Sequence, residues 1–143
     1  MNPIDTYSYR CGVIDCFNEM IRAGLKRIAL SHPVSTREER DELLEFSKKI
    51  CDEYGNRFYL EDSPLLTDLF PLSMNQGKFN IIFYRDEKDL TEYLQIKADK
   101  AELLARGAYI GQAREEIACR YGKLLSYPDE GIRRLIESNT EKE

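Results

Sequence analysis

The sequence predicts an α/β fold: a small three-stranded, mostly parallel sheet with an N-terminal helix and a helical C-terminal third. Between Leu25 and Asp86 the chain follows the order strand, helix, strand, loop and strand, and a strand–helix–strand unit of this size normally joins parallel strands through a right-handed crossover. After Asp86 the apolar residues recur at helical spacing. We therefore expect a single α/β domain over residues 1–143, with a sheet-containing part at 1–86, a helical part at 87–138 and a frayed tail at 139–143.

The first two predicted elements are a helix over residues 5–23 and a strand over residues 26–31. Gly24 ends the helix, because glycine is the usual residue just past a helix C-terminus. The strand is short and apolar in its middle, and Pro33 ends it because proline cannot continue a central strand. The apolar side chains that share one face of the helix are Val13, Phe17, Met20 and Ile21.

A second helix, expected over residues 36–54, leads to a second strand over residues 57–60. Ser35 and Thr36 are each followed three residues later by a glutamate, which is the capping-box signature of a helix start. Gly55 ends this helix. The aromatic and apolar strand then ends in an acidic turn that contains proline.

Residues 64–77 form a loop of unusual apolarity, because Leu66, Leu69 and Phe70 occur there without any sustained period. A loop of this length in a compact domain is either a lid or binding element or a cover for a sheet edge, and we favour the cover. Residues 79–84 give the clearest strand of the chain. They are nearly all apolar or aromatic, which predicts burial on both faces.

Three helices are expected after Asp86. An aspartate cap starts the first, Gly107 stops it, and Pro128 stands near the start of the last. Gly122 lies inside the second helix, where glycine costs about 1 kcal/mol relative to alanine, and we attribute it to a close contact with another helix. The expected ranges are about 86–107, 109–125 and 128–138.

Composition argues against several classes of protein. The chain has 143 residues, of which 42% are hydrophobic and 33% charged, as in a folded domain. Its net charge of -5 repels a phosphate backbone, so we do not expect nucleic-acid binding. No apolar run approaches the ~18 residues that a membrane span needs, and the N-terminal residues lack the blocks of a signal peptide. We therefore expect a soluble, cytoplasmic protein without membrane contact.

The four cysteines, at positions 11, 16, 51 and 119, form no CxxC pair. In a reducing compartment such thiols behave mostly as small buried hydrophobes, so we expect structural roles for them. Cys11 and Cys16 would point about 140° apart around a helix, which argues against a shared zinc site. We expect no metal centre from them, and nothing in the sequence identifies a cofactor.

Most residues that could carry chemistry follow the predicted strands. Ser31 and His32 end the first strand, Glu61 and Asp62 end the second, and Asp86 follows the third. Open α/β sheets bind ligands beyond the carboxyl ends of their strands, so these side chains could converge on one crevice. There His32 could act as a base or, with the carboxylates, bind a divalent ion. The alternative, which we favour, is that these are ordinary turn residues.

Arg37 is a further candidate, because it stands near the start of the helix that follows His32. The free N–H groups of a helix N-terminus attract anions. The loop has no glycine with which to close around a phosphate, so we favour simple capping by Ser35 or Thr36. The chain also lacks GxSxG, GxGxxG and GxxxxGK[ST], which argues against serine-hydrolase, dinucleotide-binding and P-loop chemistry.

The segment Gly122–Ile132 resembles a signature of glycine, leucine-leucine, glycine-tyrosine-proline and a cysteine pair. That signature belongs to an uncharacterised, mainly archaeal family, the domain of unknown function numbered four hundred and eighty-three. The segments Leu66–Pro71, Ile81–Tyr84 and Tyr93–Lys97 are also similar to that family, so the likeness covers roughly residues 25–137.

This chain departs from the family pattern where chemistry would lie. Glu130 and Gly131 replace the adjacent cysteines, and Ser126 replaces a glycine. The family has no known activity to transfer. The resemblance therefore implies no reaction, cofactor or site residue for this chain.

Two functional hypotheses from different classes remain. We favour an interaction or regulatory module that forms a homo-oligomer or binds another protein through its C-terminal helices, because no catalytic motif is found. The alternative is a small-molecule or metal-binding protein, or an enzyme, whose strand-end residues surround a pocket closed by the 64–77 loop. Only the alternative needs His32 and the carboxylates in one place.

Overall fold

The predicted segments form seven helices and three strands in the computed structural model, which describes residues 1–143. The elements are α1 (Thr6–Arg22), β1 (Ile28–Leu30), α2 (Arg37–Asp41), α3 (Leu44–Tyr54), β2 (Arg57–Glu61), α4 (Leu72–Asn75), β3 (Asn80–Tyr84), α5 (Glu87–Ala105), α6 (Gly111–Leu124) and α7 (Asp129–Ser138). None of these helices is long and apolar enough to cross a membrane.

Start and stop signals predicted from the sequence are confirmed around α2 and α3. Thr36 Oγ1 accepts the N–H of Glu39 at 3.1 Å and so caps α2. Gly55 ends α3 with a left-handed φ of 72°. The single helix expected over residues 36–54 is divided, however, because Leu43 N–H bonds to a carbonyl only three residues back and its side chain turns into the core.

The sheet has the order β1–β3–β2, and both neighbouring pairs are antiparallel. The expectation of a mostly parallel sheet is therefore wrong. The helical crossover does return β2 in the direction of β1, since both strands run against β3, but β3 lies between them. This strand suits the centre because all five of its residues are buried, as its apolar sequence predicted. In this register Ile82 of β3 lies between Leu30 of β1 and Tyr59 of β2.

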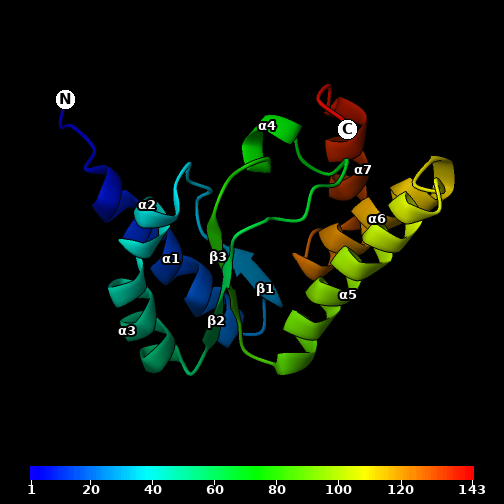
Figure 1. Cartoon of the computed structure of the whole chain (residues 1–143). Coiled ribbons are helices and arrows are strands. Elements are labelled where there is room, and N and C mark those ends of the chain that lie inside the picture. The colour runs from blue at the N-terminus through cyan, green and yellow to red at the C-terminus, as the bar shows by residue number, and fades with distance from the viewer.

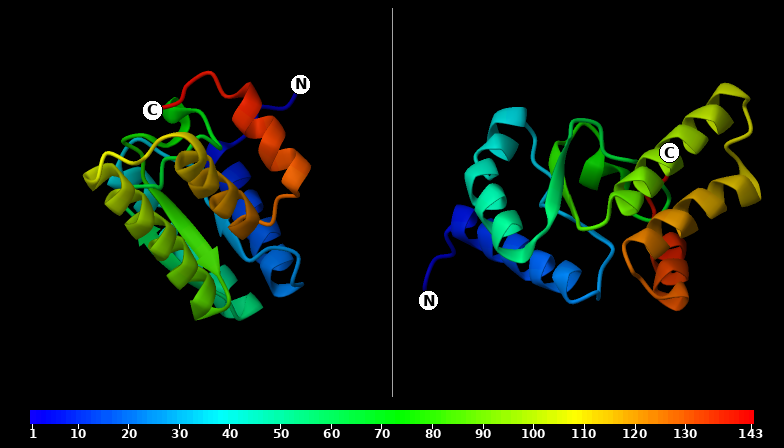
Figure 2. Two further views of the ribbon diagram at one scale, coloured as in Figure 1. Left: turned by 90° about the vertical axis from the view of Figure 1, so that its right-hand side faces the viewer. Right: turned by 90° about the horizontal axis from the view of Figure 1, so that it is seen from below.

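Helices cover both faces of the sheet, so the fold has three layers (Figure 1). α1 and α3 pack on one face, around Ala29, Ile81 and Phe83. α5, α6 and α7 lie on the other face, where Ile28 and Ile82 join their core. The view from below separates the same two groups of helices on either side of the strands (Figure 2). The alternation of side chains along each strand supplies both cores.

The segment between β2 and β3 packs against the α5–α7 layer, and its residues Phe70, Met74 and Asn75 also lie beside the edge strand β1. Leu65 and Leu69 are buried in the core of that layer, and the ring of Phe70 meets that of Tyr121 edge-on with centroids 6.1 Å apart. The only helix of this segment, α4, follows the leucines instead of containing them.

The C-terminal tail, expected to be frayed, is held against this segment. Leu72 N–H bonds to the carbonyl of Glu141 at 2.9 Å. The amide of Asn139 donates to the carbonyls of Asp68 and Phe70, both at 3.0 Å. The partners of the tail lie about seventy residues earlier in the sequence, so no local pattern in the tail could predict these contacts.

The close contact expected at Gly122 is confirmed. This glycine of α6 faces Ile132 of α7, and a Cβ at position 122 would lie 2.6 Å from Ile132 Cγ1. Ile132 is 2% exposed and β-branched, so it has little freedom to move aside. The two helices can approach to this distance only because position 122 has no side chain.

We predict that Gly122→Ala lowers the free energy of unfolding by about 1–3 kcal/mol, because the added methyl group overpacks the contact between α6 and α7. Urea unfolding followed by circular dichroism measures the change. Gly12→Ala is the matched control, since nothing lies within 4 Å of a Cβ there and alanine should stabilise α1 by up to about 1 kcal/mol. Equal effects at the two positions would contradict the proposed role of Gly122.

Candidate functional site

The residues predicted to form a strand-end site lie in three separate places. Ser31 and His32 end β1 at one edge of the sheet, whereas Glu61 and Asp62 end β2 at the other. Asp86 follows β3 at the opposite end, because β3 runs against both neighbours. The predicted convergence of imidazole and carboxylates is therefore wrong. No group of three or more His, Cys, Asp or Glu side chains is placed to hold a metal ion.

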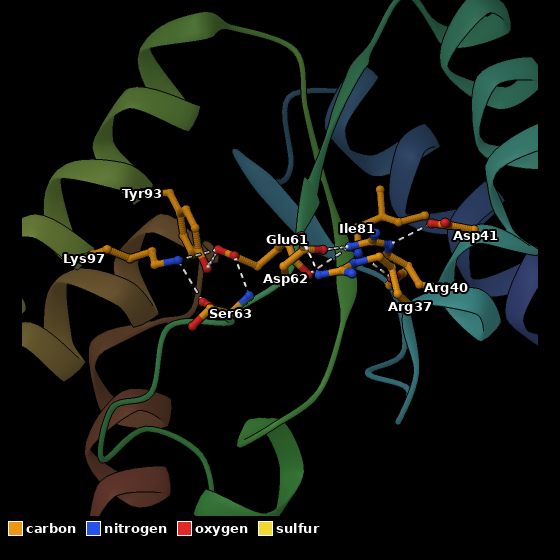
Figure 3. A network of polar contacts seen from close by, with 10 residues as sticks. Arg37, Arg40, Asp41, Glu61, Asp62, Ser63, Ile81, Tyr93 and Lys97 are labelled. Carbon is orange, nitrogen blue, oxygen red and sulfur yellow. Dashed lines mark hydrogen bonds and ion pairs between the residues drawn. The ribbon is translucent and has the colours of Figure 1, made fainter.

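Glu61 and Asp62 point to opposite faces of the sheet, because successive side chains of a strand alternate (Figure 3). The side chain of Glu61 is 4% exposed and faces α5, where Tyr93 Oη and Lys97 Nζ donate to its Oε2 at 2.6 and 2.8 Å. Its Oε1 accepts the Ser63 N–H at 2.9 Å. Neighbours thus occupy both carboxylate oxygens, and the contact fastens the start of the following loop to α5.

Asp62 is held on the other face by two arginines of α2 (Figure 3). Arg40 Nη1 lies 2.6 Å from Asp62 Oδ1, and Arg37 Nη2 lies 3.3 Å from Oδ2. The hydrogen bond from Arg40 is the main cause that lowers the pKa of Asp62, and Arg37 adds to it. Arg37, the predicted anion-binding residue, therefore already pairs with a carboxylate. Arg40, which the sequence did not single out, is the more buried partner, with its side chain 3% exposed.

Ser31 and His32 lie where a β-bulge ends the pairing of β1. Ser31 N–H bonds to Ile81 O, but the next bridge joins Val34 to Phe79. Two residues of this edge, His32–Pro33, therefore stand opposite a single residue of β3. The bulge leaves His32 exposed beside the outer edge of the sheet.

Positive groups, rather than carboxylates, surround His32. Partial burial is the main cause that lowers its pKa, and the charges of Arg10 and Lys78 lower it further. A base oriented by an acid would show the opposite shift. The surroundings of His32 thus favour a neutral imidazole next to cations.

A groove of about 380 Å³ runs beside β1, and nine of its fifteen lining residues are hydrophobic. It exists because β1 is an edge strand with α1 on one side and the turn between α6 and α7 on the other. Phe17 of α1, Tyr127 of the α6–α7 turn and Leu30 of β1 are among the residues that line it, and Met74 of α4 lines it as well. Ser31 and His32 line the end of the groove that lies beyond β1.

The charges of this groove are all positive. None of its fifteen lining residues is acidic, although acidic residues outnumber basic ones by 26 to 21 in the whole chain. Arg10 and Lys26 both line it. Ion pairs within 4.0 Å join many other residues of the chain, but none includes Arg10 or Lys26.

Lys26 connects the two walls of the groove. Its Nζ donates to the carbonyl of Leu125 at 2.7 Å and lies 5.6 and 5.3 Å from the ring centroids of Phe17 and Tyr127. Burial lowers its pKa, because no carboxylate compensates the charge. An ammonium group has three N–H donors, so Lys26 keeps donors for an anion that enters the groove.

A larger hollow, of about 510 Å³, lies between α6 and α7. Only three of its eight lining residues are hydrophobic, and its charges are of both signs. Two of them, Lys123 and Asp129, pair at 3.4 Å. The groove beside β1 is the stronger candidate because it combines apolar walls with uncompensated cations.

The cysteines lie in different surroundings. Cys11 and Cys51 are buried, Cys119 is half-buried and Cys16 is exposed. Burial raises the pKa of Cys51 to about 12, which keeps its thiol protonated. The structural role expected of the cysteines fits the two buried ones, whereas Cys16 does not belong to a core.

A scan of protein-family models, a search of curated proteins and a search of solved structures found no match for this chain. The resemblance to the archaeal family therefore stays a prediction. The case for a function rests on the groove and its surroundings.

We predict that the pKa of His32 lies below its ordinary value near 6.5, because partial burial disfavours the charged imidazolium and the adjacent cations oppose a further positive charge. Proton NMR measures it directly, since the chain has one histidine. Arg10→Gln should raise this pKa. Arg134→Gln is the control, because that arginine pairs with Glu130 on α7. A pKa above 6.5 in the unmodified protein would indicate a carboxylate partner and contradict this arrangement.

The same shift predicts how stability depends on pH. A histidine whose pKa is lower in the folded than in the unfolded chain binds protons more tightly when unfolded, so its stability contribution is present above about pH 6.5 and is lost as the pH falls through the folded pKa. His32→Gln should therefore lose less stability than the unmodified protein between pH 7.5 and pH 5, measured by urea unfolding. If the free energy of unfolding fell more steeply with decreasing pH in His32→Gln than in the unmodified protein, the prediction would be contradicted.

We predict that Tyr93→Phe lowers the free energy of unfolding by about 1–3 kcal/mol, because it removes a donor to Glu61 and leaves the buried Leu65 N–H without its acceptor. Burial raises the pKa of Tyr93, so the hydroxyl is a proton donor at any ordinary pH. Tyr9→Phe, at a tyrosine that is 60% exposed, should change stability by less than about 0.5 kcal/mol. A loss at Tyr93 no larger than at Tyr9 would refute the structural role given to this contact.

Proposed function

We propose that this protein acts by binding, and that it holds an apolar partner bearing negative charge in the groove beside β1. One observation carries the proposal: apolar walls and unpaired cations coincide in a groove without a single carboxylate, in a chain that is acidic overall. The proposal keeps the interaction module that the sequence favours. It moves the binding surface from the C-terminal helices to the edge of the sheet.

The two features of the groove have different roles in binding. Apolar walls supply affinity, since each 100 Å² of apolar surface withdrawn from water contributes about 2.5 kcal/mol. Cations supply selectivity, because an ion pair at about 4 Å is worth about 1 kcal/mol in bulk water and about 4 kcal/mol where the effective dielectric constant is 20. Lys26 is partly buried between two aromatic rings, so it lies in the second kind of environment. A neutral apolar molecule would leave this charge unpaired.

We do not propose an enzyme or metal site at the strand ends. That hypothesis required His32 beside the carboxylates. Instead Glu61 is saturated by its own neighbours, and Asp62 is bound by arginines. His32 is left among cations, where it would neither gain basicity from an acid nor share a metal ion with one.

We predict that anilinonaphthalene sulfonate, an apolar dye with one negative charge, binds the native protein in this groove. Fluorescence titration should give one site, and NMR shift changes should centre on β1 and Tyr127. Lys26→Met removes the charge but keeps an apolar stem, and Met74→Asp adds a carboxylate to a lining residue that is 45% exposed. Each should weaken binding about tenfold: Lys26→Met removes an ion pair whose Coulomb energy is largely offset by the cost of desolvating its charges, and Met74→Asp places a like charge beside the bound sulfonate.

Leu104→Asp is the matched control for this titration. Leu104 is 53% exposed on α5, and it is not among the residues that line the groove. Its replacement should leave the affinity unchanged. Absence of dye binding, or binding that all three variants retain, would contradict the proposed function.

A further inference from the structure

We propose that the occupant of the groove is an extended peptide segment with acidic residues near its ends, which adds to β1 as a further strand of the sheet. This inference rests on the binding function proposed above and narrows it to one class of partner. Three features of the groove support it: the backbone of β1, the shape of the walls, and the placement of the charges.

The backbone of β1 offers a free donor and a free acceptor on the side of the groove. In an antiparallel ladder, hydrogen-bonded and non-hydrogen-bonded pairs alternate. Ser31 N–H bonds to Ile81 O at 2.9 Å, so the preceding pair, Leu30 with Ile82, is of the second kind. The N–H and C=O of Leu30 therefore point away from β3. An added strand requires such a donor and acceptor on the edge that it joins.

The walls suit the side chains of an extended chain. Side chains of a strand alternate between two directions, so a peptide on β1 would point one set toward α1 and the other toward the α6–α7 turn. Aromatic rings line the groove on both sides, Phe17 on the α1 side and Tyr127 on the side of the α6–α7 turn. A small molecule could use either wall, but only a peptide backbone would also satisfy the edge of β1.

The cations stand at both ends of the strand. Lys26 precedes β1, whereas His32 follows it next to the charge of Arg10. Residues 26 to 32 span about 20 Å when extended at about 3.3 Å per residue, so a peptide of about seven residues reaches both ends. Acidic residues at its ends would meet cations that have no other carboxylate.

A second copy of this chain fits the groove less well. Symmetric dimers place the same surface of each copy against the other. Two such grooves, one against the other, would bring Lys26 and Arg10 toward their own copies without any carboxylate between them. The charges therefore favour a different, acidic partner.

The test starts with a phage-displayed library of random twelve-residue peptides, selected on the full chain. We expect selected peptides to combine alternating apolar residues with aspartate or glutamate near their ends. Lys26→Met and Met74→Asp should each weaken the best peptide about tenfold, whereas Leu104→Asp should leave its affinity unchanged. Added salt should weaken binding to the unmodified protein more than binding to Lys26→Met.

Backbone methylation of the peptide then tests strand addition without altering the protein. N-methyl groups are placed on alternate residues of the best peptide, in each of the two registers. Because only every second N–H of an added strand faces β1, one register should lose at least about tenfold in affinity and the other less than about twofold. Equal losses in both registers would overturn strand addition.

The remaining outcomes separate this inference from the function on which it rests. Dye binding without any selected peptide would overturn the peptide and leave the binding function standing. Failure of both dye and peptide would overturn both. Peptides that the groove variants bind unchanged, or peptides without acidic enrichment, would also overturn the inference. A dimer in sedimentation that Lys26→Met or Met74→Asp dissociates would assign the groove to a second copy instead.

Discussion

The position of β3 between β1 and β2 determines where the other parts of this protein lie. All five residues of β3 are buried, and only the central place in a three-stranded sheet covers a strand on both faces and both edges. Its insertion leaves β1 and β2 parallel in direction but not in contact. Each outer strand consequently pairs on one side only, and β1 keeps a free edge between the two helical layers.

The same arrangement explains why the polar residues at the strand ends do not act together. Antiparallel pairing sends Asp86 to the far end of the sheet, and the pleat of β2 sends Glu61 and Asp62 to opposite faces. The two carboxylates of β2 then pair separately, Glu61 with a tyrosine and a lysine of α5 and Asp62 with two arginines of α2. Their charges join the loop and α2 to the sheet, whereas Lys26 and Arg10, which line the groove, form no ion pair.

Local signals predicted the elements of this fold far better than its pairing. Thr36, Gly55 and the apolar strand at 80–84 act through neighbours in sequence, so caps, stops and burial followed from them. A strand–helix–strand unit fixes the relative direction of its strands but not which strand fits between them, because that depends on which segment has the most apolar surface to bury. The candidate site was harder to predict than the strand pairing. Ser31 and His32 were found as strand-end residues, but Arg10 and Tyr127 become their neighbours only through the tertiary fold.

An open strand edge carries a hazard, since it can template the stacking of further chains into amyloid. Three features of β1 limit that risk. The strand has only three residues, the bulge at His32–Pro33 interrupts any longer ladder, and like charges flank it. Fibril growth needs a continuous, in-register edge on every added chain, which this one does not offer. The exposed edge of β1 therefore does not promote aggregation of the protein.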